Sequence, residues 1–314
     1  MINKILDHEE LIKKPPVLID VGASGDLHAE WKEIAKYSIC IGFDGDERET
    51  DFREETGGEF KKLYVFNKIV AEKKGQTDFY LTNSPFCSSR VEPNMTELDN
   101  WAFGGLFPVD KKITTEATTI NDILSQLKLD YIDWFKTDSQ GTDMRIFTAI
   151  DQPIIDKMVV AEFEPGIINA YKQEDLLYSI IEYMSKKKFW MSDMDVKGSQ
   201  RISQKNFLKY FSKYKDELHK FNYLIKPSSC WAEVSFINNF TEQPSLNKRD
   251  VLLGCALGLV KKQYGFVIDL SEKGSEIFDD KIFTEILHYT VSLVKRREQT
   301  LFFKRVKKRL LGYV

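Results

Sequence analysis

The chain has 314 residues, of which 42% are hydrophobic and 30% charged, and a formal net charge of −3 at pH 7. This composition is that of a folded globular protein and excludes a largely disordered chain. The last twenty residues hold eight Lys or Arg against one Glu, so the rest of the chain carries about −10. An acidic body argues against nonspecific nucleic-acid binding as the main function.

The sequence contains no pattern typical of secretion, membrane spanning or metal binding. The charged amino-terminal stretch lacks the apolar core of a signal peptide, and no uninterrupted run of about 18 apolar residues follows, so we expect a cytoplasmic location. The four cysteines and four histidines are widely separated and form no Cys-x-x-Cys pair or ligand spacing. We therefore predict neither a metal site nor a disulfide framework.

Apolar runs and helical periodicity alternate along the chain. Strands are expected at Val17–Ile19, Ile39–Phe43, Leu63–Ala71, Thr77–Leu81, Tyr131–Thr137, Met158–Phe163, Phe189–Val196 and Ala232–Ile237. Helices are expected at Met1–Lys14, after Asp26, in the acidic segment between Asp44 and Gly58, at Thr119–Lys128, Asp143–Ile150, Gln173–Lys187 and Lys197–His219, and over most of the chain from Arg249.

This alternation predicts an α/β fold with a doubly wound, mostly parallel sheet and helices on both of its faces. The chain is expected to divide into residues 1–240, which hold the sheet, and residues 241–314, a mainly helical extension with a basic amphipathic end.

A long segment without periodicity, Thr82–Lys112, interrupts the pattern and carries Phe86, Trp101, Phe103 and Phe107. Loops of this length are usually functional or mobile. The aromatic side chains either wall a substrate pocket or form a small apolar cluster beneath the loop.

The stretch Val17–Gly25, VLIDVGASG, joins a buried strand to a glycine turn. Asp20 lies near the carboxyl end of this strand, where open α/β sheets bind ligands. Asp44 closes the second strand about 20 residues later, a spacing suited to hydrogen bonds with the two ribose hydroxyls of a nucleoside. The alternative is a tight turn between strand and helix with a surface Asp.

In combination, several segments resemble the FkbM family of S-adenosylmethionine-dependent methyltransferases. They are LIDVGASGD, GFD, NKIVAEKKGQTDFYL, DYIDWFKTDSQGTDMRIF, the stretch from Val159 to Asp195, and WAEVSFI. The sequence departs from the family pattern in two places, with Gly45 for the usual proline and Gln140 for the usual Glu. The resemblance covers about Val17 to Asn238 and implies a Rossmann-like class I methyltransferase.

The resemblance also implies which residues bind the cofactor. Asp20 and the turn Gly22, Ala23, Ser24 and Gly25 would hold the methionine portion of S-adenosylmethionine, and Asp44 the ribose. Glu72 is a candidate near the adenine, or alternatively a solvated acid of a hairpin.

Three acceptor-side residues follow from the same resemblance. Asp138, at the end of the fourth strand, is the leading candidate for the base that removes the acceptor proton, provided burial raises its pKa. Lys136 would pair with it or orient the acceptor, or else only extend from a strand edge, and Glu162 would contact the substrate. Gln140 removes one carboxylate from this segment.

The expected activity is O-methyl transfer to a hydroxyl of a sugar, glycan or related small molecule, with no metal-ligating residues predicted and without nucleic acid as a substrate. The alternative is a nucleoside-binding or scaffold protein that has lost the chemistry, as Gln140 suggests.

The carboxyl-terminal helix combines Leu301, Phe302, Val306 and Leu310 at helical spacing with the eight basic residues. Such a helix could lie on the anionic inner face of a membrane as a peripheral contact. It could equally pack on the domain or on a second subunit of a homo-oligomer.

Overall fold

A computed structural model describes residues 1–23, 28–44, 54–240 and 246–310 of the chain. The chain forms two compact units. One contains Met1–Pro15 together with Glu242–Val314, and the other contains Pro16–Thr241. The first fifteen residues therefore group with the carboxyl-terminal helices, whereas the sequence had placed them with the sheet.

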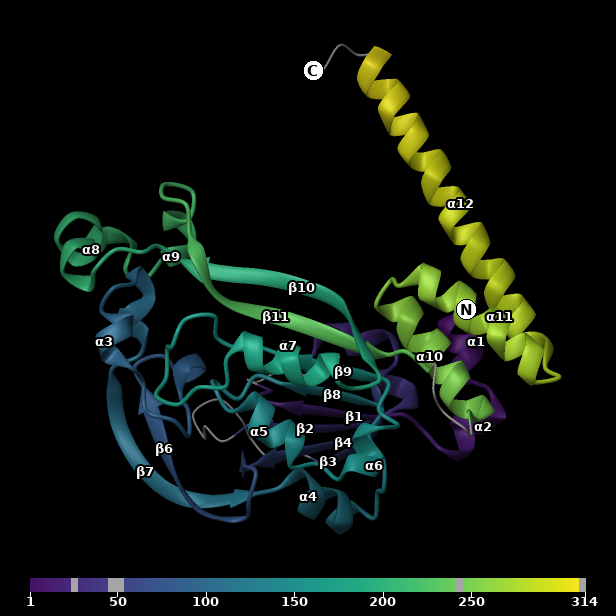
Figure 1. The fold of residues 1–314 in the computed structure, drawn as a ribbon, viewed down its shortest axis with the longest axis horizontal. Coiled ribbons are helices and arrows are strands. Elements are labelled where there is room, and N and C mark those ends of the chain that lie inside the picture. Colours follow the sequence, from purple (N-terminus) through teal and green to yellow (C-terminus); the bar gives the residue numbers. More distant parts are fainter. Residues whose placement is uncertain (24–27, 45–53, 241–245, 311–314) are drawn as a thin grey trace. The chain divides into compact units, whose positions relative to one another are not determined.

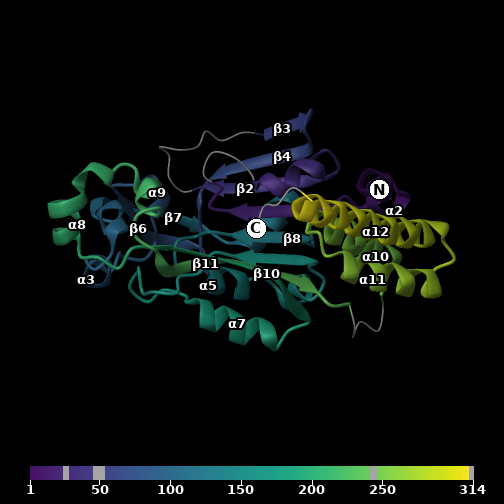
Figure 2. The same cartoon turned by 90° about the horizontal axis from the view of Figure 1, so that it is seen from above.

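Five parallel strands form the centre of the sheet in the Pro16–Thr241 unit (Figures 1 and 2). β1 (Val17–Val21) lies between β2 (Ile39–Asp44) and β8 (Trp134–Thr137). β4 (Phe60–Asn67) continues the sheet beyond β2, and β9 (Val160–Phe163) continues it beyond β8. All five residues of β1 are buried, as expected for a parallel strand covered on both faces.

Antiparallel strands complete both edges of the sheet. β3 (Glu54–Gly57) pairs with β4, β11 (Ser228–Asn238) with β9, and β10 (Phe189–Ser199) with β11. The order is β10-β11-β9-β8-β1-β2-β4-β3. The predicted mixed α/β fold with a large, mostly parallel sheet is confirmed. The chain builds outward from β1 in one direction and from β8 in the other, so the strand order reverses between these two strands.

Helices of the same unit cover one face of the sheet. They are α4 (Ile120–Leu127), α5 (Asp143–Thr148), α6 (Gln152–Ile155) and α7 (Leu177–Ser185). Their apolar side chains share one buried cluster with those of β1 that point to this face. The cluster includes Val17, Ile19, Val21, Ile123, Phe147, Ile155 and Ile180. Helix α4 begins as predicted, because the Thr119 hydroxyl accepts a hydrogen bond from the backbone N–H of Asp122 at 3.1 Å.

The opposite face carries a different structure from the one expected. The predicted helix after β1 is replaced by two short 3₁₀ segments, η1 (Ala29–Glu33) and η2 (Ala35–Tyr37), and Asp26 lies outside the described residues. Trp31 of η1 is 1% exposed and packs edge-on against Trp134, with ring centroids 6.1 Å apart. The large Trp31 side chain therefore fixes η1 on the sheet without a full helix.

Two other segments differ from the expected secondary structure where the structure describes them. Of the acidic segment expected to be helical, residues 45–53 lie outside the described part of the chain, and Glu54–Gly57 form strand β3. Gly57 and Gly58 have positive φ angles of 89° and 74° and turn the chain from β3 into β4. A second sheet, of order β5-β7-β6, contains β5 (Ile69–Val70), β6 (Gly75–Thr82) and the unpredicted β7 (Val109–Thr118). The sequence did not predict β7, because its antiparallel partner β6 lies far from it along the chain.

Short helices lie between β6 and β7 and between β10 and β11. The first group comprises η3 (Pro85–Cys87), α3 (Met95–Leu98) and η4 (Ala102–Leu106). The second comprises α8 (Gln204–Phe211), η5 (Ser212–Tyr214) and α9 (Leu218–Phe221).

The other unit is helical. It contains α1 (Ile2–Leu6), α2 (Glu9–Lys13), α10 (Lys248–Val260), α11 (Tyr264–Ile277) and α12 (Lys281–Leu310).

Apolar packing explains why the amino terminus belongs to this unit. Ile5, Leu6 and Leu11 are at most 2% exposed. The Arg249 guanidinium donates to the carbonyl of Lys14 at 2.9 Å. No helix among the described residues is long and apolar enough to cross a membrane.

The first prediction concerns Gly22, whose φ is +87° and where an added Cβ would lie 2.1 Å from the Asp138 carbonyl oxygen. Gly57 has a similar φ, but an added Cβ would meet nothing within 4 Å. Gly22→Ala should therefore lower the free energy of unfolding by about 1 to 3 kcal/mol more than Gly57→Ala. Urea unfolding of both variants measures this, and equal losses would contradict it.

Candidate functional site

The carboxyl ends of β1 and β8 meet at the site. The backbone N–H of Asp138 donates to the carbonyl of Val21 at 2.8 Å, and the N–H groups of Gly22 and Ala23 donate to the carbonyl of Phe43 at 2.8 and 2.9 Å. Because Gly22 has no Cβ, its backbone can approach the carbonyl of Asp138. Gly22, at the start of the predicted turn, and Asp138, the predicted base, are therefore neighbours.

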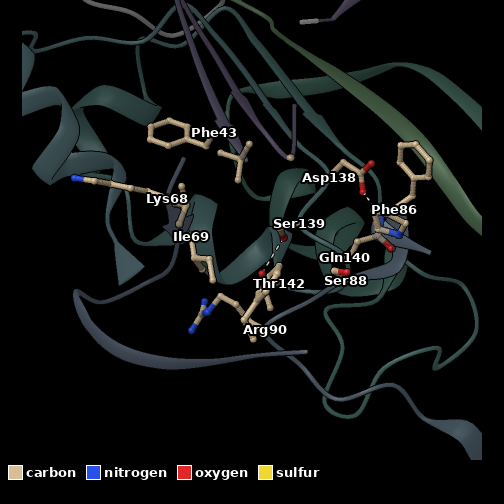
Figure 3. A pocket seen from close by; sticks show the side chains of 15 residues that line it. Phe43, Lys68, Ile69, Phe86, Ser88, Arg90, Asp138, Ser139, Gln140 and Thr142 are labelled. Carbon is tan, nitrogen blue, oxygen red and sulfur yellow. Dashed lines mark hydrogen bonds between the residues drawn. The ribbon is translucent and has the colours of Figure 1, made fainter. Parts of the chain in front are cut away.

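A first cavity, of about 90 Å³, opens beside this turn (Figure 3). We call it the glycine-turn cavity. Its lining includes Gly22, Phe43, Ile69, Val70, Phe86, Arg90, Asp138 and Gln140. In Figure 3, Phe43 lies on one side of it, and Asp138, Gln140 and Phe86 lie together on the other.

A second cavity, of about 300 Å³, adjoins the first, and we call it the aromatic cavity. Five aromatic side chains line it, namely Phe86, Phe103, Phe107, Tyr171 and Trp231. Its acidic lining residues are Asp138, Glu164 and Glu174. Phe86, Asp138 and Gln140 line both cavities, so the two spaces meet at these residues.

Aromatic residues of the Thr82–Lys112 segment line a cavity and also form the expected small apolar cluster. Phe103 and Phe107 line the aromatic cavity and also belong to a small apolar cluster with Leu98 and Tyr171. Trp101 does not line the cavity. It is 5% exposed, and its indole N–H donates to Glu97 at 2.8 Å.

Gln140 links Asp138 to the wall of the aromatic cavity. Its amide nitrogen donates to Asp138 Oδ1 at 2.6 Å, and its Oε1 lies 2.8 Å from the Tyr171 hydroxyl. Its backbone has a positive φ of 55°, and its carbonyl accepts from the Ser89 hydroxyl at 2.6 Å. An amide can donate to Asp138, which an ionised Glu cannot do, so Gln140 orients the carboxylate.

Asp138 and Glu164 form a coupled pair of buried acids. Burial raises the pKa of Asp138 to about 6, whereas the positive charge of Lys136 and the hydrogen bond from Gln140 act in the opposite direction. Burial also raises the pKa of Glu164, and the charge of Asp138 adds to this increase. The pair therefore tends to keep one proton, held mainly on Glu164.

Asp20 and Lys136 pair with each other behind the cavities. Lys136 Nζ lies 3.2 Å from Asp20 Oδ1, and the backbone N–H of His28 donates to Asp20 Oδ2 at 3.2 Å. Burial lowers the pKa of Lys136, but the charges of Asp20 and Asp138 outweigh this and raise it above the usual value. Neither residue is among those lining the two cavities, so both act from behind the site.

Glu162 is held away from both cavities, unlike the position that the sequence suggested. Its Oε2 accepts from the Trp134 indole at 2.7 Å, and its Oε1 accepts from the Ser235 hydroxyl. Glu164, just past the end of β9, lines the aromatic cavity. Position along the strand explains the difference, because Glu162 lies within β9 beside Lys136, where Trp134 and Ser235 bond to it, whereas Glu164 lies beyond the carboxyl end of the strand.

Asp143 fixes the turn that carries Gln140. Its Oδ1 accepts from the Thr137 hydroxyl at 2.8 Å and from the backbone N–H and hydroxyl of Ser139 at 2.8 and 2.7 Å. The side chain is fully buried, which raises the pKa of Asp143. This acid is therefore a positioning group.

Of the remaining residues predicted to bind the cofactor, the structure describes the side chain of Glu72 only. Glu72 lies between β5 and β6 and pairs with Arg90 at 2.8 Å, and Arg90 lines the glycine-turn cavity. Burial raises the pKa of Glu72, but the bond with Arg90 outweighs it and the net shift is downward. Ser24 and Gly25, like the side chain of Asp44, lie outside the described part of the chain.

Among the residues that the structure describes, one group of side chains has ligand atoms close enough to hold a metal ion. Single ligand atoms of His28, Glu30 and Glu162 lie within 4.8 Å of one another. Glu162 is already bonded to Trp134 and Ser235, and none of the three residues lines either cavity. The cluster therefore lies outside both cavities, although the backbone N–H of His28 bonds to Asp20 behind them.

Comparisons of this chain with protein-family models, with curated proteins and with solved structures found no match. The functional assignment therefore depends on the geometry and chemistry of the site. Sequence reasoning missed Tyr171, Trp231 and Glu164, although the position of Glu164 just after a strand was a usable signal.

The second prediction concerns Glu164. Its pKa is higher in the folded than in the unfolded chain, so ionisation destabilises the fold as the pH rises above the unfolded value near 4.5. Glu164→Gln should therefore have a free energy of unfolding about 1 to 3 kcal/mol above that of the wild type at pH 8, and so a higher unfolding temperature, with a smaller difference at pH 5.

Glu162→Gln is the matched control, because that carboxylate accepts two hydrogen bonds from neutral donors. It should lower the unfolding temperature at both pH values. A Glu164→Gln variant that loses stability equally at pH 5 and pH 8 would show that Glu164 is not a protonated acid.

Proposed function

We propose that the chain is an S-adenosylmethionine-dependent O-methyltransferase with a Rossmann-like class I fold, similar to the FkbM family. The strand order β4-β2-β1-β8-β9 supports this, because it matches the first five positions of the order 3-2-1-4-5-6 of dinucleotide-binding sheets. The antiparallel β11 between β9 and β10 also fits the class I methyltransferase arrangement.

The main support is the junction of the two cavities at Asp138. Methyl transfer needs a cofactor site and an acceptor site that meet where the methyl group passes. The glycine-turn cavity lies at the strand-order reversal between β1 and β8, where open α/β sheets bind nucleotides. The aromatic cavity begins at the same Asp138 and supplies an acceptor site.

Gly22 and Phe43 fit the nucleoside cofactor, because they offer an open backbone and an apolar surface beside the end of β2. Asp44, the last residue of β2, is the proposed ribose ligand, and Ser24 and Gly25 would complete the turn around the methionine portion. Asp20 would support this turn through the backbone N–H of His28. The bound cofactor would supply an activated methyl group on its sulfonium.

Asp138 would accept the proton that the acceptor hydroxyl loses as its oxygen gains the methyl group. Its raised pKa makes it a better base than an exposed Asp, and it is still largely ionised at neutral pH. Gln140 would orient the carboxylate, and the Lys136 charge would keep it ionised. Glu162 would act only through its contacts with Trp134 and Ser235.

The lining of the aromatic cavity favours an uncharged acceptor. It contains three acidic side chains, and none of the lining residues that the structure describes is Lys, Arg or His. An anionic group would lose its hydration there without a cation to compensate, and the ionised Asp138 would repel it. Flat aromatic walls suit the apolar face of a sugar ring, so a sugar or glycan hydroxyl is the proposed acceptor.

The second candidate function is nucleoside binding without methyl transfer. Gln140 supports it, because this residue replaces a carboxylate that is usual in the resembling family. Against it, the Gln140 amide contacts Asp138 directly and leaves that carboxylate as the base.

The third prediction concerns the cofactor. The wild type should bind S-adenosylmethionine in calorimetry, and Asp44→Ala should bind it roughly tenfold to a hundredfold more weakly, since two hydroxyl hydrogen bonds are worth about 1 to 3 kcal/mol. Glu116→Ala, an exposed acid on β7, is the matched control and should bind like the wild type. Absence of wild-type binding at millimolar cofactor would exclude the proposed function.

The fourth prediction concerns Asp138. Asp138→Asn should lower methyl transfer by roughly a hundredfold or more while cofactor affinity stays nearly unchanged, because it removes the base and not the binding site. In the wild type the rate should rise with pH through about 6, as Asp138 ionises, and the variant should lose this rise. Formation of S-adenosylhomocysteine with a panel of glycans measures both effects.

A loss of cofactor affinity in Asp138→Asn would instead place this residue in the cofactor site. An unchanged rate would show that another group removes the proton.

A further inference from the structure

Residues 200–227 form a small helical lobe inserted between β10 and β11, which we call the basic lobe. Figures 1 and 2 both show its helices α8 and α9 at one end of the β10–β11 pair, near α3. Phe207 and Phe221 are buried in its centre, at 1% and 0% exposure, and pack with Ala102 of η4. The lobe is therefore a folded element and not an extended loop.

Its outer surface exposes large apolar side chains. Leu208 is 50% exposed and Tyr210 is 62% exposed, both on α8. Just after α9, Tyr223, Leu224 and Ile225 are 89%, 58% and 38% exposed in succession. Three consecutive apolar residues exposed to water do not stabilise the fold, so such a run usually marks an interaction site.

The same lobe is strongly basic although the whole chain is acidic. It holds seven Lys or Arg against two acids, Asp216 and Glu217. Lys205, Lys209, Lys213 and Lys226 are exposed, and no ion pair is recorded for them within the part of the chain that the structure describes. Exposed Lys and exposed apolar side chains thus occur together on this lobe.

This combination identifies one kind of partner. Interfaces with other proteins are depleted in Lys, whereas surfaces that lie on anionic membranes combine Lys with aromatic and aliphatic side chains. We propose that the basic lobe binds an anionic lipid bilayer, with Tyr223, Leu224 and Ile225 entering the headgroup region and the lysines facing the lipid phosphates.

The lobe is also joined to the wall of the aromatic cavity. The Gln204 side chain donates to the carbonyl of Ala102 at 2.9 Å, and the N–H of Ala102 donates to the carbonyl of Gln200 at 3.0 Å. Phe103 and Leu106 of the same η4 line the cavity. If the proposed methyl transfer is correct, on which this step depends, the acceptor hydroxyl belongs to a lipid-anchored molecule.

The test is sedimentation of the full-length protein with phosphatidylcholine vesicles that contain phosphatidylglycerol, at low salt. The wild type should pellet with these vesicles and not with pure phosphatidylcholine. Two lobe variants should each bind at least tenfold more weakly. One replaces Tyr223, Leu224 and Ile225 by Ser, and the other replaces Lys205, Lys209 and Lys213 by Glu.

Two charge-matched variants control for the change in net charge. Lys61, Lys73 and Lys111 are exposed elsewhere on the same unit, and their replacement by Glu should leave pelleting close to the wild type. Replacing Lys304, Lys307 and Lys308 by Glu tests whether the vesicle binding comes from the carboxyl-terminal helix and not from the basic lobe. Wild-type protein that stays in the supernatant, or wild-type pelleting by either lobe variant, would overturn the proposal.

A second measurement does not depend on loss of binding. The four native cysteines are buried, so Leu224→Cys can be labelled with an environment-sensitive fluorophore. Its emission should shift to the blue with the anionic vesicles, whereas a label at Glu116→Cys should not respond. An unresponsive label at Leu224→Cys would also overturn the proposal. Vesicle binding needs no cofactor, so it can be tested separately from the proposed activity. Calorimetry with the cofactor on the lobe variants should show wild-type affinity even where vesicle binding is lost.

Discussion

The close approach of Gly22 to the carbonyl of Asp138 is the constraint on which the site depends. It is possible only because position 22 has no side chain and accepts a positive φ. It brings the ends of β1 and β8 together at the point where the strand order reverses. The two cavities then meet at Asp138, so the backbone geometry of one turn determines which side chain lies between them.

Two pairs of charged or titratable side chains lie near the junction of the cavities at Asp138. Behind the cavities, Lys136 and Asp20 neutralise each other, and Asp20 also accepts a hydrogen bond from the backbone N–H of His28. In the cavities, Asp138 and Glu164 lie in apolar surroundings that favour one shared proton. The opposite charges of Asp20 and Lys136 offset the desolvation of each other. Asp138, next to Glu164, retains the raised pKa that a base needs.

The sequence predicted the local parts of the site better than the distant ones. Gly22 and Asp138 were identifiable because each follows an apolar strand, and strand ends meet at one edge of a parallel sheet. Glu162 was chosen over Glu164 although the predicted strand end, Phe163, is also the observed one. The hydrogen bonds that hold Glu162 to Trp134 and Ser235 come from other strands, and no local pattern reveals them. Tyr171 reaches the site through tertiary packing with Cys87, which no local pattern reveals.

The most direct measurement is a crystal structure of the protein grown with S-adenosylhomocysteine. The account predicts density for the nucleoside in the glycine-turn cavity beside Phe43 and for the thioether sulfur beside Asp138, facing the aromatic cavity. Crystals grown at saturating ligand with that cavity empty, or with the ligand bound elsewhere, would contradict it. The aromatic cavity would then have to be explained without methyl transfer.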